Sequence, residues 1–472
     1  MNFIGRKTEI ESLASLDFSQ KSKLTVVYGR RRVGKSTLIR KTFEKSKILI
    51  FEGLEGEPTS VQKTEFLSQC HQQLKTNNKF PPPAQHSSWS DILIYLSKLI
   101  NKKPTVILFD EFQWLASERK ELVSHLKYVW DNFFLNKNRI HLILCGSVSS
   151  FLVKKVLKSK ALYGRVDLEI HLEPLSYSEI KEGFLNKRSH RESLEAYMTV
   201  GGVPRYLELF NDKLSVLLNL QRLAFHPQGY LFCDFDKIFV SHFGKNPVYK
   251  KIILSLAKHN FLTRNQLITQ GYETSGGRMT EYLEELLLAD FIEKYQPLDR
   301  PITSKLCRYR LKDNYLKFYF KFLLPFQKKI KNSFFVKKPL NLNMHQPYRI
   351  WLGLAFEKFC YDNHELLANK LGFSAVDYQY GSWFRREEQQ TGCQIDLLFL
   401  RSDKVITLCE IKYQTRPIGL DVIQDVLKKI ELLNYKKNYT VEPVLITASP
   451  PTNKLLQESF FSRILTVEQI LN

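Results

Sequence analysis

A glycine-rich turn near the N-terminus is the first pattern that could do chemistry. Gly29-Arg30-Arg31-Arg32-Val33-Gly34-Lys35-Ser36 has the spacing G-x4-G-K-S, and Thr37 follows in a helical run. Glycines allow backbone N–H groups to wrap phosphates, the lysine faces the β- and γ-phosphates, and the hydroxyl can bind magnesium. We therefore expect residues 29–37 to bind ATP and Mg²⁺, with Lys35 stabilising charge during hydrolysis and Ser36 ligating the metal.

Two adjacent acids form the second pattern. Asp110 and Glu111 follow the apolar run Val106–Phe109. If this run is a buried strand ending at the carboxyl edge of a parallel sheet, both acids lie at the phosphate end of the site. We expect Asp110 to help hold the magnesium ion and Glu111 to be the general base that activates a water.

A third set of polar residues lies in the C-terminal quarter. Asp396 begins one candidate strand, and Glu410 and Lys412 end the next. Because residues i and i+2 of a strand share a face, Glu410 and Lys412 point the same way. Asp396 and Glu410 could then bind one magnesium ion, with Lys412 positioning a water and Glu357 adding a ligand from a helix. The alternative is an internal ion pair without catalysis.

The elements that must position these residues follow from the alternation of apolar and helical runs. In residues 1–175, short apolar runs are separated by segments long enough for crossover helices, which predicts a P-loop domain with a mostly parallel sheet. The candidate strands are Leu24–Tyr28, Ile48–Phe51, Val106–Phe109, His141–Cys145 and Leu168–Leu172. Residues 176–240 read as a helical lid, which opens with a capping box of Ser176 and Glu179.

The middle of the chain predicts a different module. Residues 241–325 contain the pattern of three helices and a hairpin, which is the order of a winged helix-turn-helix: Pro247–His259, Thr263–Gln270, Met279–Ala289, Phe291–Leu298 and Leu306–Leu311. Met279–Ala289 would be the recognition helix, with Arg278 at its start and Arg264 on the preceding helix. The alternative is a domain-packing role, because three acids on the helix would repel phosphates: Glu281, Glu284 and Glu285.

The rest of the chain completes a multidomain α/β prediction. Residues 326–347 read as a basic linker, and residues 348–472 as an α/β domain with candidate strands at Asp396–Leu400, Val405–Ile411 and Val444–Ile446.

The charge of the chain indicates a polyanionic partner. The formal net charge is +22, and residues 301–350 contain 12 Lys and Arg against a single Asp. The cations between Lys305 and Lys338 alternate with aromatics, so this stretch could neutralise phosphates and stack bases, or else form a helix core with a basic face. We expect nucleic acid, DNA in particular, as the partner and no membrane. The scattered cysteines and the absence of a long apolar run favour a cytoplasmic protein.

Taken together, the N-terminal motifs resemble the archaeal-type ATPase family within the AAA+/STAND branch of P-loop proteins. Besides residues 28–36, the resemblance rests on four other segments: Phe3-Ile4-Gly5-Arg6 with Glu9, Cys145-Gly146-Ser147, Gly164-Arg165 and Gly201-Gly202-Val203-Pro204-Arg205-Tyr206-Leu207. It implies that Ser147 senses the γ-phosphate, that Arg165 completes the site of a neighbouring subunit, and that Arg205 is a second sensor.

Several of these residues also have other interpretations. Ser147 could be an ordinary strand-end hydroxyl, and Arg165 a surface ion-pair residue or an arginine acting on its own site. The three arginines of the P-loop could contact DNA, a partner subunit or solvent.

The C-terminal motifs are similar to the PD-(D/E)xK nuclease superfamily and to a domain of uncharacterised function that follows many archaeal-type ATPases. The matching segments are Phe356-Glu357, Gly381-Ser382-Trp383, Ile395-Asp396 and Glu410-Ile411-Lys412, with Gln424 on the following helix. The proline of the motif is absent before Asp396.

Two functions follow as hypotheses. The first is an ATP-hydrolysing protein that acts on DNA and cuts it with a magnesium-dependent C-terminal domain. The second is a STAND-like switch that binds DNA or a protein and does not cut. A membrane-surface ATPase ranks last, since the chain lacks a basic amphipathic helix beside an apolar face.

Overall fold

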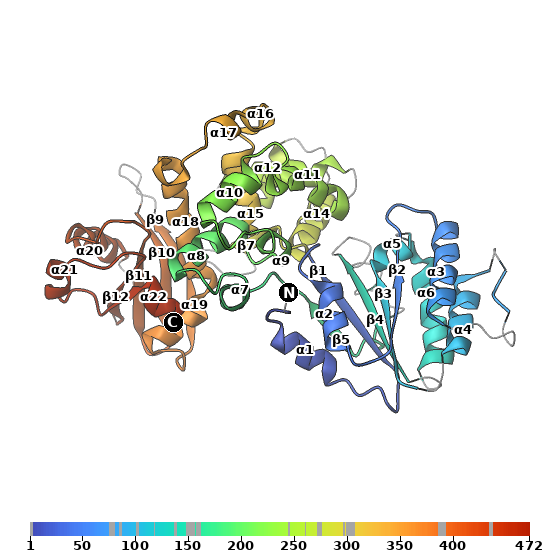
Figure 1. Cartoon of the computed structure of the whole chain (residues 1–472). Helices are drawn as coiled ribbons and strands as arrows, with labels where there is room; N and C mark the ends of the chain where they lie inside the picture. Colours follow the sequence, from blue (N-terminus) through green and yellow to red (C-terminus); the bar gives the residue numbers. More distant parts are fainter. Residues whose placement is uncertain are drawn as a thin grey trace.

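The computed structural model describes most of the chain. The residues described are 3–74, 81–84, 87–100, 103–117, 119–135, 139–147, 156, 162–243, 246–259, 261–270, 276–295, 298, 307–385, 393–433 and 438–472. Figure 1 shows an N-terminal lobe built on a sheet, a second sheet in the opposite lobe that carries the C-terminus, and a group of helices between them.

The N-terminal sheet is parallel, as the sequence predicts. Its strands have the order β2-β3-β4-β1-β5, and every described pairing in it is parallel. The strands are β1 (Lys23–Gly29), β2 (Ile48–Glu52), β3 (Thr105–Asp110), β4 (Ile140–Ser147) and β5 (Leu168–His171). Strands β3 and β4 are buried along their whole length, which explains their continuous apolar sequences.

Helices cover both faces of this sheet. One face packs against α1 (Lys7–Ala14) and α2 (Lys35–Thr42) through a core that includes Val27, Leu38 and Ile143. The other face packs against helices that carry the larger core. These are α3 (Thr59–Gln73), α4 (Trp89–Leu99), α5 (Phe112–Leu115) and α6 (Lys120–Val129), which continues into a π-helical turn, Trp130–Phe134.

A group of helices follows the sheet, as predicted for the lid. It comprises α7 (Tyr177–Gly183), α8 (His190–Val200), α9 (Pro204–Leu207), α10 (Val216–Ala224) and α11 (Tyr230–Phe243). The expected capping box at Ser176 and Glu179 is present.

The middle module has helices where the sequence places them. They are α12 (Pro247–Lys258), α13 (Arg264–Thr269) and α14 (Gly276–Leu288). Strands β6 (Leu262–Thr263), β7 (Ile292–Tyr295) and β8 (Arg308–Leu311) form an antiparallel sheet of order β6-β8-β7, in which β6 was not predicted. Part of the expected hairpin, including Lys305, lies outside the described residues.

The prediction of a linker at residues 326–347 is wrong. This segment folds into α16 (Gln327–Lys331), α17 (Phe334–Lys337) and a short 3-10 turn, Leu342–Met344. The buried side chains of Ile330, Phe335 and Leu342 anchor it to the core, so apolar residues spaced between lysines make it a packed element.

Base stacking by most of the neighbouring aromatic residues is also excluded. The helix α15 (Asn314–Phe318) and the π-helical turn Tyr319–Leu323 bury nearly all of their rings. The buried rings are those of Tyr309, Tyr315, Phe318, Tyr319, Phe320, Phe322 and Phe335, whereas Phe334 is exposed. The alternative of a helix core with a basic face therefore describes this region.

The C-terminal domain begins with α18 (Gln346–Asp362) and α19 (His364–Leu371). Its sheet has the order β13-β12-β11-β10-β9, antiparallel from β9 to β11 and parallel from β11 to β13. The strands are β9 (Tyr378–Arg385), β10 (Cys393–Arg401), β11 (Val405–Lys412), β12 (Thr440–Thr447) and β13 (Arg463–Thr466). The helices α20 (Asp421–Leu433), α21 (Asn453–Gln457) and α22 (Val467–Leu471) complete the domain. Within the described part of the chain, no helix has the length and apolarity needed to cross a bilayer.

Candidate functional site

The turn between β1 and α2 has the backbone of a phosphate-binding loop. Gly29 ends the strand, and a Cβ at this position would lie 2.3 Å from the carbonyl oxygen of Leu172 beside it, so no side chain fits. Gly34 caps α2 with a φ of 92°, a conformation that favours glycine. The helix N-terminus thus opens onto the loop with its backbone N–H groups unpaired by a side-chain cap, which suits an anion.

Lys35 lies within the loop. It is 6% exposed, and its Nζ donates to the carbonyl oxygens of Arg30 at 3.0 Å and Gly29 at 3.3 Å. Ser36 is half-buried and Thr37 is exposed at the start of α2. The ammonium group is therefore held by the loop at the position where phosphates would need it.

Asp110 and Glu111 lie at the carboxyl end of β3, as predicted. Asp110 is 9% exposed, and its Oδ1 accepts a hydrogen bond from the backbone N–H of Glu111 at 3.0 Å. Glu111 has a φ of 48° and accepts a hydrogen bond from Gln113. A positive φ at a glutamate is strained, and such strain is concentrated at functional positions.

The pKa of the Cys145 thiol on β4 depends on the charges of Lys35, Asp110 and Glu111. Burial raises its pKa well above the ordinary value, the charges of Asp110 and Glu111 raise it further, and the charge of Lys35 opposes them. The lysine of the loop and the two acids therefore lie close enough to Cys145 for their charges to act on its thiol. Ser36 and Asp110 are the residues that could hold a metal there.

Ser147 ends β4 beside the loop. It lies opposite Gly29 in the register of β4 and β1 and is 3% exposed. Its Oγ makes no hydrogen bond to any described residue. The sensor role that the resemblance implies for Ser147 stays a prediction.

The three arginines of the loop differ from one another. Arg30 is 1% exposed and forms an ion pair with Asp313, so contact with DNA, a partner subunit or solvent is excluded for its side chain. Arg32 forms an ion pair with Asp234 of α11. Arg31 is the one that reaches the surface, where it lies 3.7 Å from Glu55.

Arg165 lies at the opposite edge of the sheet. It precedes β5, near the start of β1, and forms two hydrogen bonds with Asp131, of 2.7 and 2.9 Å. Because the loop follows the other end of β1, Arg165 cannot act on the site of its own chain. The surface ion pair is present, and action on a neighbouring subunit stays a prediction.

Arg205 lies on the short lid helix α9. Its guanidinium pairs with Glu208 at 3.2 Å and lies 5.5 Å from the ring centroid of Tyr230. Arg32 of the loop lies over the same ring at 5.3 Å. The lid arginine is thus brought near the loop, although no described contact joins it to Lys35.

The C-terminal residues come together through the register of two strands. Leu397 lies opposite Cys409 in the antiparallel pairing of β10 and β11, and Asp396 and Glu410 are the neighbours of these two residues toward the same end of the sheet. The pairing of β10 with β9 shifts in register between Ile395 and Leu398, a stretch that includes Asp396. Bulges beside a site are a common way to aim a side chain.

Glu410 is held by two cations. It is 2% exposed, and its carboxylate pairs with Lys412 at 2.8 Å and with Lys429 of α20 at 2.7 Å. Burial lowers the pKa of Lys412, but the charge of Glu410 outweighs it and the pKa is raised. Lys429 was missed in the sequence. It could have been found because it follows Val422 by seven residues, on the buried face of an amphipathic helix.

Glu357 from α18 faces the same two acids. Burial, followed by the charges of Asp396 and Glu410, raises its pKa to about 8. Burial also raises the pKa of Asp396, whose Oδ1 accepts a hydrogen bond from Gln394 at 3.0 Å. The three carboxyl groups therefore lie close enough for their charges to act on one another. Gln424 is exposed on α20.

The carboxylate oxygens of Glu357, Asp396 and Glu410 do not all lie within 4.8 Å of one another. Of the described residues, the only group of three potential ligands with atoms within 4.8 Å of one another is His171, Glu173 and Asp290. There Lys312 already pairs with Glu173 at 3.0 Å and with Asp290 at 2.8 Å, so a cation occupies the place of a metal.

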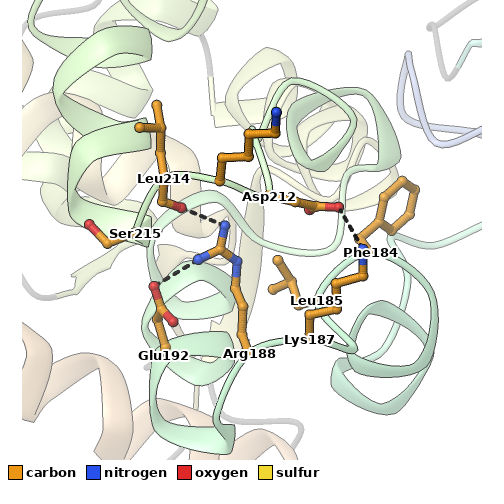
Figure 2. A pocket seen from close by; sticks show the side chains of 9 residues that line it. Phe184, Leu185, Lys187, Arg188, Glu192, Asp212, Leu214 and Ser215 are labelled. Carbon is orange, nitrogen blue, oxygen red and sulfur yellow. Dashed lines mark hydrogen bonds and ion pairs between the residues drawn. The ribbon is translucent and has the colours of Figure 1, made fainter.

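A small pocket lies among the lid helices. Figure 2 shows Arg188 at its centre, with its guanidinium bonded to Glu192 and to the carbonyl oxygen of Leu214. The pocket has a volume of about 280 Å³, and its remaining lining residues are Phe184, Leu185, Lys187, Asp212, Lys213 and Ser215.

A parallel sheet, a phosphate loop after β1 and an acidic pair after β3 define the N-terminal domain as a P-loop ATPase domain. Residues 3–210 match the profile of a family described as an ATPase domain predominantly from Archaea, so this part of the chain is an archaeal-type ATPase domain.

Two relatives in Methanocaldococcus jannaschii share sequence with the chain. The uncharacterized protein MJECL04 is 28% identical over 451 residues, which is 93% of this chain and 95% of that protein. The uncharacterized ATP-binding protein MJ0423 is 48% identical over 46 residues, 10% of this chain and 78% of that protein.

Among solved structures, the Walker-type ATPase PABY2304 of Pyrococcus abyssi is 20% identical, with a TM-score of 0.49 over 67% of this chain and 96% of that one. The Aeropyrum pernix ORC2 protein is 14% identical, with a TM-score of 0.41 over 71% of this chain and 97% of that one.

Proposed function

We propose that the chain is an ATP-driven protein that acts on DNA and cuts it with its C-terminal domain. The observation that carries the proposal is that Asp396 and Glu410 each lie next to the paired residues Leu397 and Cys409 on adjacent strands, with Lys412 bonded to Glu410. Two carboxylates and a lysine at neighbouring strand positions are the donor set of a PD-(D/E)xK nuclease.

A magnesium ion would be held there by Asp396 and Glu410. When bound, it supplies positive charge that polarises the phosphodiester and promotes ionisation of a water. Glu357 of α18, whose charge is felt together with those of Asp396 and Glu410, would add a further ligand. Lys412, once released from Glu410, is placed to orient the attacking water or to stabilise the charge on the phosphate.

The ATPase domain would combine its loop and its acidic pair in a similar way. The backbone of residues 29–34 wraps the phosphates, and Lys35 neutralises the charge that develops on the γ-phosphate. Ser36 and Asp110 would hold magnesium, which would supply positive charge beside the phosphate oxygens. Glu111 accepts the proton of the attacking water, and Ser147 donates to the γ-phosphate.

DNA would be bound mainly by the exposed lysines on α16, on α17 and beside them. We name this surface the lysine cluster, and its members are Lys321, Lys328, Lys329, Lys331, Lys337 and Lys338. Phe334 within it is 45% exposed and lies 5.6 Å from Lys329 Nζ, so an unpaired base could stack there. The two helices project from the top of the molecule in Figure 1.

Two exposed apolar side chains lie on the face of α18 that carries Glu357. Ile350 and Leu354 are 59% and 54% exposed, and they precede Glu357 at helical spacing on one face. A strand of DNA lying along this face would place its backbone near Asp396.

The module of α12 to β8 would be a winged helix-turn-helix with a lesser share of the contact. At the start of its helix α14, Arg278 is exposed and could contact a phosphate. Glu285 of the same helix is buried and accepts a hydrogen bond from Tyr249, so it packs inside the module. Arg264 donates to Thr280 at 2.9 Å, which joins the two helices.

A second candidate is a regulatory switch that binds DNA or a protein and does not cut. The observation in its favour is that Lys412 and Lys429 each pair with one oxygen of Glu410. A domain that has kept a nuclease-like fold without the chemistry, and uses these residues only as an internal ion-pair network, would have the same contacts.

One experiment separates the two. Supercoiled and linear DNA are incubated with the protein and magnesium or manganese, with and without ATP, beside Asp396→Ala and Asp403→Ala. Asp403 lies in the exposed turn between the same strands. Cleavage that is lost only in Asp396→Ala supports the nuclease, and binding without any cleavage in either metal leaves the switch.

A further inference from the structure

We propose that Asp313 and Asp234 are positioning residues for the P-loop, through which nucleotide binding is coupled to the docking of the lid and the middle module. Both lie far from the loop in the sequence, and each pairs with a different arginine of the loop. The inference concerns the ATPase site and stands independently of the proposed nuclease.

Arg30 is held by segments from two other parts of the chain. Its guanidinium pairs with Asp313, which precedes α15, and donates to the hydroxyl of Tyr206 in the lid at 3.4 Å. It also lies 5.4 Å from the ring centroid of Phe291, which precedes β7. Arginine stays charged in proteins, so burial at 1% exposure requires this carboxylate.

Arg32 is held by the lid in a parallel arrangement. It has a φ of 73° and pairs with Asp234, a residue of α11 that is 2% exposed. The other oxygen of Asp234 accepts a hydrogen bond from Tyr206 at 2.8 Å. Tyr206 therefore joins the two ion pairs into one network of two cations and two anions.

The network reaches the lysine that would contact the phosphates. The carbonyl oxygen of Arg30 accepts a hydrogen bond from Lys35 Nζ at 3.0 Å, while the side chain of the same residue is fixed by Asp313. Loss of Asp313 would leave a buried guanidinium without its partner, and the loop would move to solvate it. The position of Lys35 would move with it.

The reverse coupling follows from thermodynamic linkage. If docking of the lid and the middle module raises the affinity for nucleotide by some factor, bound nucleotide must raise the docking equilibrium constant by the same factor. Asp313 also caps α15, with its Oδ1 accepting from the backbone N–H of Leu316 at 2.7 Å. Ordering the loop with nucleotide should therefore stabilise the start of that helix.

The test compares charge-neutral variants in the full-length protein. Asp313→Asn and Asp234→Asn remove the charge, and asparagine can still cap α15. The matched control is Asp236→Asn, two residues further along α11, where the side chain is 72% exposed and pairs with Lys250. We expect both test variants to raise the KM for ATP about tenfold with a smaller loss of kcat, and the control to stay within about twofold. A tenfold change in affinity corresponds to about 1.4 kcal/mol.

A second measurement needs no variant. Hydrogen exchange of residues 308–318 and 230–238 is followed in the unaltered protein with and without a non-hydrolysable ATP analogue, and we expect slower exchange in both segments with the analogue.

A conservative variant completes the test. Asp313→Glu, which keeps the charge, should retain part of the affinity for ATP that Asp313→Asn loses. Folded Asn variants with unchanged KM, or exchange that is not slowed by the analogue, would overturn the proposal.

Discussion

Ser147 and Gly29 lie opposite each other at the ends of β4 and β1, and the buried Ser147 hydroxyl has no hydrogen-bond partner among the described residues. An unsatisfied buried polar group costs about 1–3 kcal/mol. In the function that we propose, the γ-phosphate of ATP would accept the hydrogen bond of this hydroxyl.

Replacement of this hydroxyl should therefore lower turnover without loosening the fold. For Ser147→Ala we expect kcat for ATP hydrolysis to fall by about tenfold to a hundredfold. The melting temperature without nucleotide should stay the same or rise, since the unpaired group is removed. Steady-state kinetics and calorimetry provide both numbers, and an unchanged kcat would argue for an ordinary strand-end serine.

The loop lysine offers a comparison within one helix. Lys35 is buried in the loop, whereas Lys41 of the same helix is 46% exposed and pairs with Glu44. Lys35→Ala should reduce kcat/KM for ATP by about a hundredfold or more, because the charge on the phosphates loses its partner. Lys41→Ala should have almost no effect. Equal activity of the two variants would refute the assignment of the site.

Arg165 tests assembly. Its place at the far edge of the sheet, paired with Asp131, permits action only on a neighbouring subunit. Arg165→Ala and Glu111→Ala should each hydrolyse ATP poorly, and mixing them should restore part of the activity, because one mixed interface then contains both residues. Activity measured over a range of protein concentrations checks this, and the absence of recovery on mixing would indicate a surface ion pair.

The lysine cluster makes a prediction about salt. Neutralising three of its members by Lys328→Ala, Lys329→Ala and Lys331→Ala should weaken DNA binding. The slope of log K against log salt should fall by up to about 0.9 for each phosphate that a lysine no longer neutralises. Lys7, Lys45 and Lys47, exposed in the ATPase domain, are the matched control set. Equal salt slopes for the two triple variants would place the DNA-binding surface elsewhere.

His141 makes a prediction about pH. It is fully buried on β4, its Nε2 lies 2.8 Å from Thr25 Oγ1, and burial lowers its pKa to about 4. The unfolded chain binds a proton near pH 6.5, so the stability contributed by the neutral ring is complete above that pH and is lost as pH falls toward 4. The loss is about 3 kcal/mol. In denaturant melts, His141→Gln should be less stable at pH 7 and should vary less over the acidic range in which the histidine ring titrates.

Part of the site could be read from local sequence because its geometry is local. The loop of residues 29–36 is specified by two glycines and a lysine within one turn, and Asp110 and Glu111 directly follow a buried strand. A parallel sheet then brings strand ends to one edge whatever the intervening loops are. The order of helices and strands in the middle module and several C-terminal strands followed from periodicity in the same way, although β6, β9 and β13 are too short or too polar to stand out.

What the sequence by itself determined was the kind of chemistry available: a phosphate loop, an acidic pair and a pair of strands carrying Asp396 and Glu410. Only the tertiary structure decided which charged side chains pair with one another. Arg32 meets Asp234 across 202 residues of sequence, and Lys429 enters the carboxylate cluster from a helix 19 residues after Glu410. Charged side chains are buried only where a partner neutralises them, and such partners are set by the packing of whole domains, which no local pattern records.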